Sequence, residues 1–167
     1  MKEFDIAIVG GGLAGLTSAI HLAGAGLKVC VLEKDPYPQH KVCGEYLSRE
    51  IMPYLESLGV NLELQKPVNI NTLKYSNPSG KTIDTTLPQG GIGMSRYLLD
   101  SVLYQKALEN GATGIIDTVV NIEFREDSFL LTMKEEMPLK AKIVLGAFGK
   151  RSLLDKKLER DFINRKT

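Results

Sequence analysis

Four glycines and one acid in the first 33 residues have the types and the spacing that could bind a dinucleotide. The glycines are Gly10, Gly11, Gly12 and Gly15, and the acid is Glu33. In this spacing Gly10 permits a tight turn, Gly12 lets a pyrophosphate approach the backbone, and Gly15 lets a helix pack against a strand. Glu33, about 20 residues after the glycines, could accept hydrogen bonds from ribose hydroxyls.

The elements that must position these residues are predicted by the same stretch. Residues 6–9 predict a short buried strand, 13–25 a helix, and 29–33 a second strand ending in the acid. The free amides and the positive dipole end of the helix would face a diphosphate, so that no lysine is needed. Glu33 would repel a 2′-phosphate, which Lys34 could offset only in part. The alternative is a glycine-rich turn in another kind of α/β protein, and the four elements together disfavour it.

The composition is that of an ordinary globular chain. The 167 residues are 43% apolar and 25% charged, enough for one sizeable core. The formal net charge of +1 gives no reason to expect nucleic acid or an anionic membrane as a partner. Cys30 and Cys43 lack the spacing of a disulfide framework or a zinc site, so we expect no metal and a cytoplasmic location. Glycines and polar residues interrupt the apolar stretch over residues 6–32, which argues against a signal peptide or a membrane span.

The rest of the chain predicts a hairpin inserted into an α/β pattern, followed by a small β-meander. The loop of residues 34–44 is rich in proline and should lie beside the nucleotide. Residues 90–96 predict a flexible crossing. The other expected elements are a helix from Ser48 to about Leu58, strands at 68–76 and 81–87, a helix at 97–110, a strand at 113–117, a meander of strands at 119–125, 128–135 and 137–140, and a buried strand at 141–147.

Four segments, in the right order, resemble the flavoprotein monooxygenase and geranylgeranyl reductase superfamily. They are the triple glycine with Glu33, Lys-Val-Cys-Gly-Glu at 41–45, residues 94–100, and residues 145–152. The resemblance covers nearly the whole chain. It implies an α/β fold, namely a Rossmann-like FAD-binding domain with a parallel sheet, a β-meander and a partial substrate-domain hairpin at 66–90. It implies FAD rather than NAD, because NAD dehydrogenases do not place a hairpin and an arginine-helix segment after the second strand.

The resemblance also implies which residues bind FAD. The pyrophosphate would be lined by Gly10, Gly12, Leu13, Ala14 and Gly15, and the adenosine ribose would contact Glu33 and Lys34. Val119 would meet the adenine, and Arg96 would approach the ribityl chain or the diphosphate. The path toward the flavin ring would be lined by Lys41, Val42 and Cys43. Ala147 and Gly149 end a strand whose edge would face the same ligand.

Two of these positions keep a second interpretation. Arg96 could be a surface charge near a helix N-terminus rather than a cofactor ligand. A Cys43 thiol beside a flavin could tune or exchange electrons, but a free cysteine is more often a small buried residue. Phe148 stands where hydroxylases of the superfamily carry an acid, which shifts the resemblance toward reductase-like and halogenase-like relatives. No residue is a convincing general acid or base, so the catalytic residues are unknown.

Members of the superfamily continue for roughly as long again, a length typical of two domains. Nothing after Ser152 resembles their Gly-Asp motif, and Leu154, Leu158 and Phe162 predict an apolar helix face without a partner. We therefore expect residues 1–167 to be the N-terminal FAD-binding part of a longer flavoenzyme, or a natural half, and to be inactive alone.

The substrate implied by the resemblance is a small or lipid-like molecule, with NAD(P)H as a candidate reductant. The alternatives are an NAD-binding dehydrogenase module and a nucleotide-binding fragment without turnover.

Overall fold

The structure is a computed structural model that describes residues 1–149, 152–158 and 160. The chain divides into two compact units by contacts between its residues. Unit 1 comprises residues 1–37 together with 103–167, and unit 2 comprises residues 38–102.

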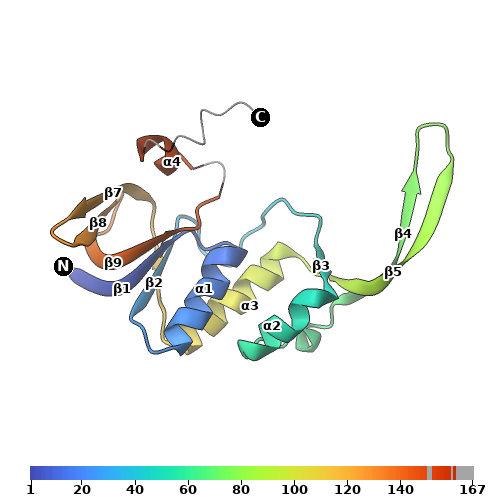
Figure 1. The fold of residues 1–167 in the computed structure, drawn as a ribbon, viewed down its shortest axis with the longest axis horizontal. Coiled ribbons are helices and arrows are strands. Elements are labelled where there is room, and N and C mark those ends of the chain that lie inside the picture. The colour runs from blue at the N-terminus through green and yellow to red at the C-terminus, as the bar shows by residue number, and fades with distance from the viewer. Residues whose placement is uncertain (150–151, 159, 161–167) are drawn as a thin grey trace. The chain divides into compact units, whose positions relative to one another are not determined.

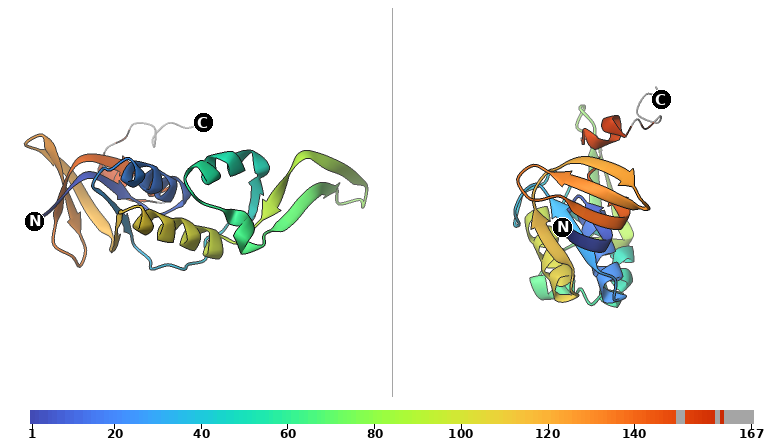
Figure 2. Two further views of the ribbon diagram at one scale, coloured as in Figure 1. Left: turned by 90° about the horizontal axis from the view of Figure 1, so that it is seen from below. Right: turned by 90° about the vertical axis from the view of Figure 1, so that its left-hand side faces the viewer.

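Unit 1 contains a sheet with the strand order β6-β2-β1-β9-β8-β7 within the described residues (Figure 1). Four strands are parallel to one another, and β7 and β8 are antiparallel neighbours. The bounds are β1 (Lys2–Val9), β2 (Val29–Glu33), β6 (Thr113–Ile116), β7 (Val119–Arg125), β8 (Ser128–Met133) and β9 (Leu139–Gly146). Helix α1 (Leu13–Gly24) connects β1 to β2 and lies beside both of them (Figure 2).

The core of unit 1 covers both faces of β1. Side chains alternate between the two faces of a strand, and Ile6, Ala7, Ile8 and Val9 are all buried. Such burial on both faces is typical of parallel strands. One face contributes to a cluster with the meander, which contains Phe4, Ala7, Val9, Cys30, Leu32, Val119, Leu131, Met133, Leu139, Ala141 and Leu154. The meander therefore packs against the strands that carry the glycine turn and Glu33.

Unit 2 contains an antiparallel sheet with the strand order β3-β5-β4. The outer part of the β4–β5 hairpin is amphipathic, because Tyr75 pairs with Ile83 on one face while Lys74 pairs with Asp84 on the other. The elements are β3 (Tyr46–Ser48), 3₁₀ helix η1 (Arg49–Ile51), α2 (Met52–Ser57), 3₁₀ helix η2 (Leu62–Gln65), β4 (Val68–Ser76) and β5 (Thr82–Gly93). Helix α3 (Arg96–Glu109) has its first half in unit 2 and its second half in unit 1.

The fold class is confirmed, but the structure differs from the local predictions in three places. Residues 90–93 are not a flexible crossing, because they form the end of β5, where residues 91–93 pair with β3 on one side and β4 on the other. Gly91 suits this strand because a Cβ there would overlap the ring of Tyr46. The helix expected from Ser48 is present in two parts, the 3₁₀ helix η1 followed by α2 up to Ser57, but Ser48 makes no side-chain cap.

The third difference concerns residues 137–147. The expected meander strand and the expected buried strand are one strand, β9, because β1 pairs with it along its whole length. The apolar face expected in the C-terminal tail is seen only in part. In α4 (Leu154–Lys157) Leu154 is buried and the following Leu158 is exposed, while Phe162 lies outside the described residues. The assignment of residues 66–90 to a substrate domain stays a prediction.

Candidate functional site

The glycine turn after β1 is packed backbone to backbone against the loop after β9. Gly10 has a φ of 109°, and a Cβ on it would overlap the carbonyl of Ala147. The Ala147 amide donates a hydrogen bond to the carbonyl of Val9 at 2.8 Å. Only glycine fits a positive φ and so close an approach, so the predicted reason for Gly10 agrees with its surroundings.

The first turn of α1 presents donors that the helix does not use. The first bond of the helix runs from the Leu16 amide to the Gly12 carbonyl at 2.9 Å, so Leu13, Ala14 and Gly15 have amides without an intrahelical acceptor. No side chain caps this end, and the first turn contains no acid. The positive end of the helix dipole is therefore not offset by an acid in its first turn, which suits a diphosphate.

Glu33 is buried at the end of β2, where it is 7% exposed. Its Oε2 accepts from the Gly11 amide at 2.9 Å, and its Oε1 accepts from the Lys34 amide at 3.0 Å. The Asp35 amide also donates to Oε1, at 3.5 Å, so three backbone amides hold the carboxylate. The Lys34 side chain is exposed and pairs with Asp35 at 3.4 Å. Glu33 thus also orients the turn, which its spacing alone did not predict.

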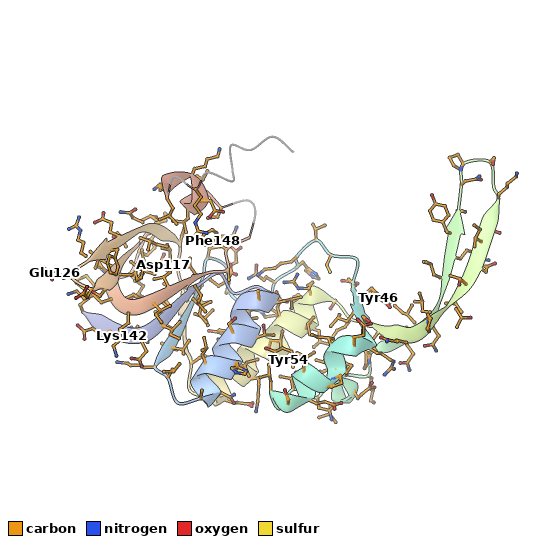
Figure 3. All side chains as sticks on the ribbon, viewed as in Figure 1. Tyr46, Tyr54, Asp117, Glu126, Lys142 and Phe148 are labelled. Carbon is orange, nitrogen blue, oxygen red and sulfur yellow. The ribbon has the colours of Figure 1, made fainter. Side chains whose placement is uncertain are left out.

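Asp117, which no motif in the sequence singles out, holds the backbone after β6 and after β8 (Figure 3). Its carboxylate accepts from the amides of Thr118 at 2.6 Å, Glu135 at 3.0 Å and Glu136 at 2.7 Å. Burial would raise the pKa of Asp117, but the backbone hydrogen bonds outweigh burial and lower it. An acid directly after a strand, a common start of a turn, was the signal available. Val119, two residues on, has a buried side chain, so its expected contact with adenine would have to use the backbone.

The loop after β9 brings Phe148 back over the end of that strand (Figure 3). A Cβ on Gly146 would lie 3.0 Å from the Phe148 ring, and the ring packs against the core of unit 1. Gly149 has a φ of 70°, and nothing lies within 4 Å of the position of a Cβ on it. Phe148 therefore has a packing role. Ala147 and Gly149 are the two predicted positions in this loop, and of these Ala147 is the one that contacts the glycine turn.

The predicted residues of unit 2 include a buried charge cluster. Asp100 is 0% exposed, and its carboxylate accepts two bonds from the Arg96 guanidinium, at 2.6 and 2.8 Å. Lys41 Nζ lies 3.6 Å from the same carboxylate. The hydrogen bonds to Asp100 raise the pKa of Arg96 despite its partial burial, and the side chain of Cys43 contributes in the same direction. Arg96 is therefore a fixed cation rather than a mobile surface charge.

The two cysteines differ in their surroundings. Cys43 is exposed, and its Sγ accepts from the Glu45 amide at 3.4 Å. Cys30 is buried, and burial raises its pKa to about 12, so it is a thiol of the core. The interpretation of Cys43 as a small buried residue is wrong, because the loop at 41–45 carries it at the surface. Val42 beside it is also exposed.

Of the predicted residues, Lys41, Val42, Cys43 and Arg96 lie in unit 2, and the others lie in unit 1. Within unit 1 the turn, the first turn of α1 and Glu33 are in direct contact. This part of the predicted site is the one that the geometry brings together.

A comparison with known proteins finds a family match in the N-terminal third of the chain. Residues 5–57, which contain the turn, α1 and Glu33, match the family model described as FAD dependent oxidoreductase. The chain is also similar to the geranylgeranyl diphosphate reductase of Rhodobacter capsulatus, with 29% identity over 156 residues. That alignment covers 90% of this chain and 38% of the reductase.

Solved structures show the same fold. A geranylgeranyl bacteriochlorophyll reductase-like protein from Thermoplasma acidophilum superposes with a TM-score of 0.80 at 24% identity, over 96% of this chain and 43% of that one. The p-nitrophenol 4-monooxygenase of Pseudomonas putida superposes with a TM-score of 0.81 at 20% identity, over 95% and 44%. The fold is thus that of Rossmann-like FAD-binding flavoproteins, and the chain spans about two fifths of the length of these relatives.

Proposed function

We propose, from the kinship of residues 5–57 with FAD-dependent oxidoreductases, that this chain binds FAD through its adenosine diphosphate end. It would supply the FAD-binding part of an oxidoreductase of the geranylgeranyl reductase or monooxygenase kind. The observation that carries the proposal is the contact between the turn and Glu33. The uncapped helix N-terminus that follows this turn suits a diphosphate, and the buried acid suits a ribose.

Bound FAD would supply the redox chemistry, and the chain would bind and orient it. The amides of Leu13, Ala14 and Gly15 would donate to the diphosphate, and Glu33 would accept from the ribose. Arg96, fixed by Asp100, would offer a guanidinium to the diphosphate or the ribityl chain. We assign no general acid or base, because the binding of FAD does not require one.

The substrate class follows from the relatives rather than from the site. The Rhodobacter capsulatus protein is named a reductase of geranylgeranyl diphosphate, and we infer a small or lipid-like substrate for this protein, with NAD(P)H as the reductant and the cytoplasm as the location. Among the described residues, no helix is long and apolar enough to cross a membrane. The alternative of an NAD-binding module is not favoured, since the matching family is FAD-dependent.

An absorbance spectrum of the purified chain, with and without reconstitution by FAD, is the first test. We expect flavin bands between about 350 and 500 nm that stay with the protein through gel filtration. FAD should raise the midpoint temperature of thermal unfolding by more than NAD does, because a ligand stabilises the state that binds it. A chain that takes up no FAD, or that NAD stabilises more, would contradict the proposal.

Gly12→Asp tests the position of the diphosphate. The new carboxylate would stand at the N-cap of α1, where the ligand's own negative charge must lie, so we expect FAD binding to fall below detection while the fold persists. Ala25→Asp is the matched control, because it adds the same charge at the exposed C-cap of the same helix. Equal FAD affinity in the two variants would remove the assignment of the diphosphate to this helix end.

A further inference from the structure

Gly11 is a glycine for a reason that dinucleotide binding does not provide. The pattern Gly-x-Gly-x-x-Gly leaves its second position open. In this structure a Cβ on Gly11 would overlap the hydroxyl of Tyr37 and would lie 3.0 Å from the Cβ of Glu33. Gly11 thus makes room for two side chains from the segment that ends β2 and follows it.

Both polar groups of Gly11 are held by those two side chains. Its amide donates to Glu33 Oε2 at 2.9 Å, and its carbonyl accepts from the Tyr37 hydroxyl at 2.6 Å. Two anchors on one residue fix the peptide planes on either side of it, since only φ and ψ can rotate. The next residue, Gly12, is the N-cap of α1, so the orientation of Gly11 sets the direction in which the first helical amides point.

Tyr37 is itself held in place from the other side of its ring. It stacks on Tyr104 of α3 with the ring centres 4.2 Å apart and the planes 19° apart. The Tyr104 phenol in turn lies over Gly114 of β6, where a Cβ would overlap it. A chain of contacts therefore runs from Gly114 through Tyr104 and Tyr37 to Gly11, and all four residues belong to unit 1.

We propose that Tyr37 is a positioning residue for the bound dinucleotide, acting through the carbonyl of Gly11, and that Tyr104 and Gly114 hold Tyr37 in register. The inference rests on the proposed binding of FAD and concerns its adenosine diphosphate end. By fixing the turn before the ligand arrives, Tyr37 reduces the ordering that binding must impose, which strengthens binding without a new contact to the ligand.

Tyr37→Phe tests the hydroxyl, because the ring and its stack on Tyr104 remain. We expect FAD to bind roughly three- to tenfold more weakly, the effect of one lost hydrogen bond. ADP should lose the same factor, because the turn is the part of the site that the two ligands share. Equilibrium titration of FAD fluorescence and calorimetric titration of ADP measure the two factors on the full chain. Tyr75→Phe is the matched control: it removes a hydroxyl from an exposed tyrosine of β4 in unit 2, and should change either affinity by less than about twofold.

Gly114→Ala tests the chain of contacts from its far end. The added methyl group displaces the Tyr104 ring, so we expect weaker binding of FAD and ADP from a residue that contacts neither ligand. In the background of Tyr37→Phe the same substitution should add little, because both changes act through one hydroxyl. Affinities are compared well below the unfolding temperature of each variant, so that a loss of stability alone does not move them.

The outcomes separate this inference from the proposed function. If the wild-type chain binds FAD and ADP and Tyr37→Phe binds both equally well, the positioning role is wrong and FAD binding stands. If Tyr37→Phe weakens FAD but not ADP, Tyr37 acts on the flavin end, which also overturns the inference. If the wild-type chain binds neither ligand, the proposed function fails, and the inference fails with it.

Discussion

The two units each bury carboxylates, but they satisfy them in opposite ways. In unit 1, Glu33 lies at the end of β2 and Asp117 directly follows β6. Both accept hydrogen bonds from backbone amides. In unit 2, Asp100 is bonded to the guanidinium of Arg96 and lies near the ammonium of Lys41. Glu33 and Asp117 therefore fix the path of the backbone, whereas Asp100 fixes the positions of two cationic side chains.

The difference indicates what each region can offer an anionic ligand. A turn held by Glu33 offers backbone amides and a helix dipole, which carry no net charge. A guanidinium held by Asp100 offers a full charge, but only while its buried partner is present. Three substitutions test this contrast.

Asp100→Ala should have the largest effect, about 3 kcal/mol off the free energy of unfolding. Removing one partner of a buried ion pair leaves the other charge uncompensated, and Asp100 is fully buried. Urea denaturation followed by circular dichroism measures the change. Asp84→Ala is the control, because its ion pair with Lys74 is exposed on both sides and should contribute less than about 1 kcal/mol. If both variants lose the same free energy of unfolding, burial of the Asp100 ion pair does not add to stability.

Glu33→Ala should weaken FAD binding by about 1 to 3 kcal/mol, because it removes a charged acceptor and leaves the Gly11 amide without its carboxylate partner. Fluorescence titration measures the affinity. Glu3→Ala, which removes an exposed acid from β1 of the same sheet, should leave it unchanged. An unaltered affinity for Glu33→Ala would place the ribose elsewhere and would reduce the role of Glu33 to holding the turn.

Asp117→Asn should have the smallest effect, about 1 to 2 kcal/mol at pH 7, because the amide still accepts but without charge. The pKa of Asp117 is lowered from 3.8 in the folded chain, so its ionised form stabilises the fold above about pH 4. That contribution is lost as the pH falls through the lowered value. Denaturation of both proteins across this range should show the difference between them shrinking in acid; a difference independent of pH would exclude the carboxylate as its cause.

The order of these effects does not follow the order in which the sequence reveals the residues. Glu33 was found by its spacing from the glycines, although its bond to Gly11 was not. Arg96 and Asp100 are four residues apart on one helix, so their pairing could be foreseen, but the complete burial of Asp100 could not. For Asp117 the sequence predicts only the last residue of a strand.

The sequence by itself determined the strand, turn, helix and acid of residues 5–33, because hydrophobic periodicity and turn chemistry act between near neighbours. Only the tertiary structure decided which polar groups meet. Tyr37 and Gly11 are 26 residues apart, and Asp117 is 18 and 19 residues from the Glu135 and Glu136 amides that it holds. A buried polar group must find a partner, but the strand order decides which partner is within reach, and no local pattern of residues encodes that order.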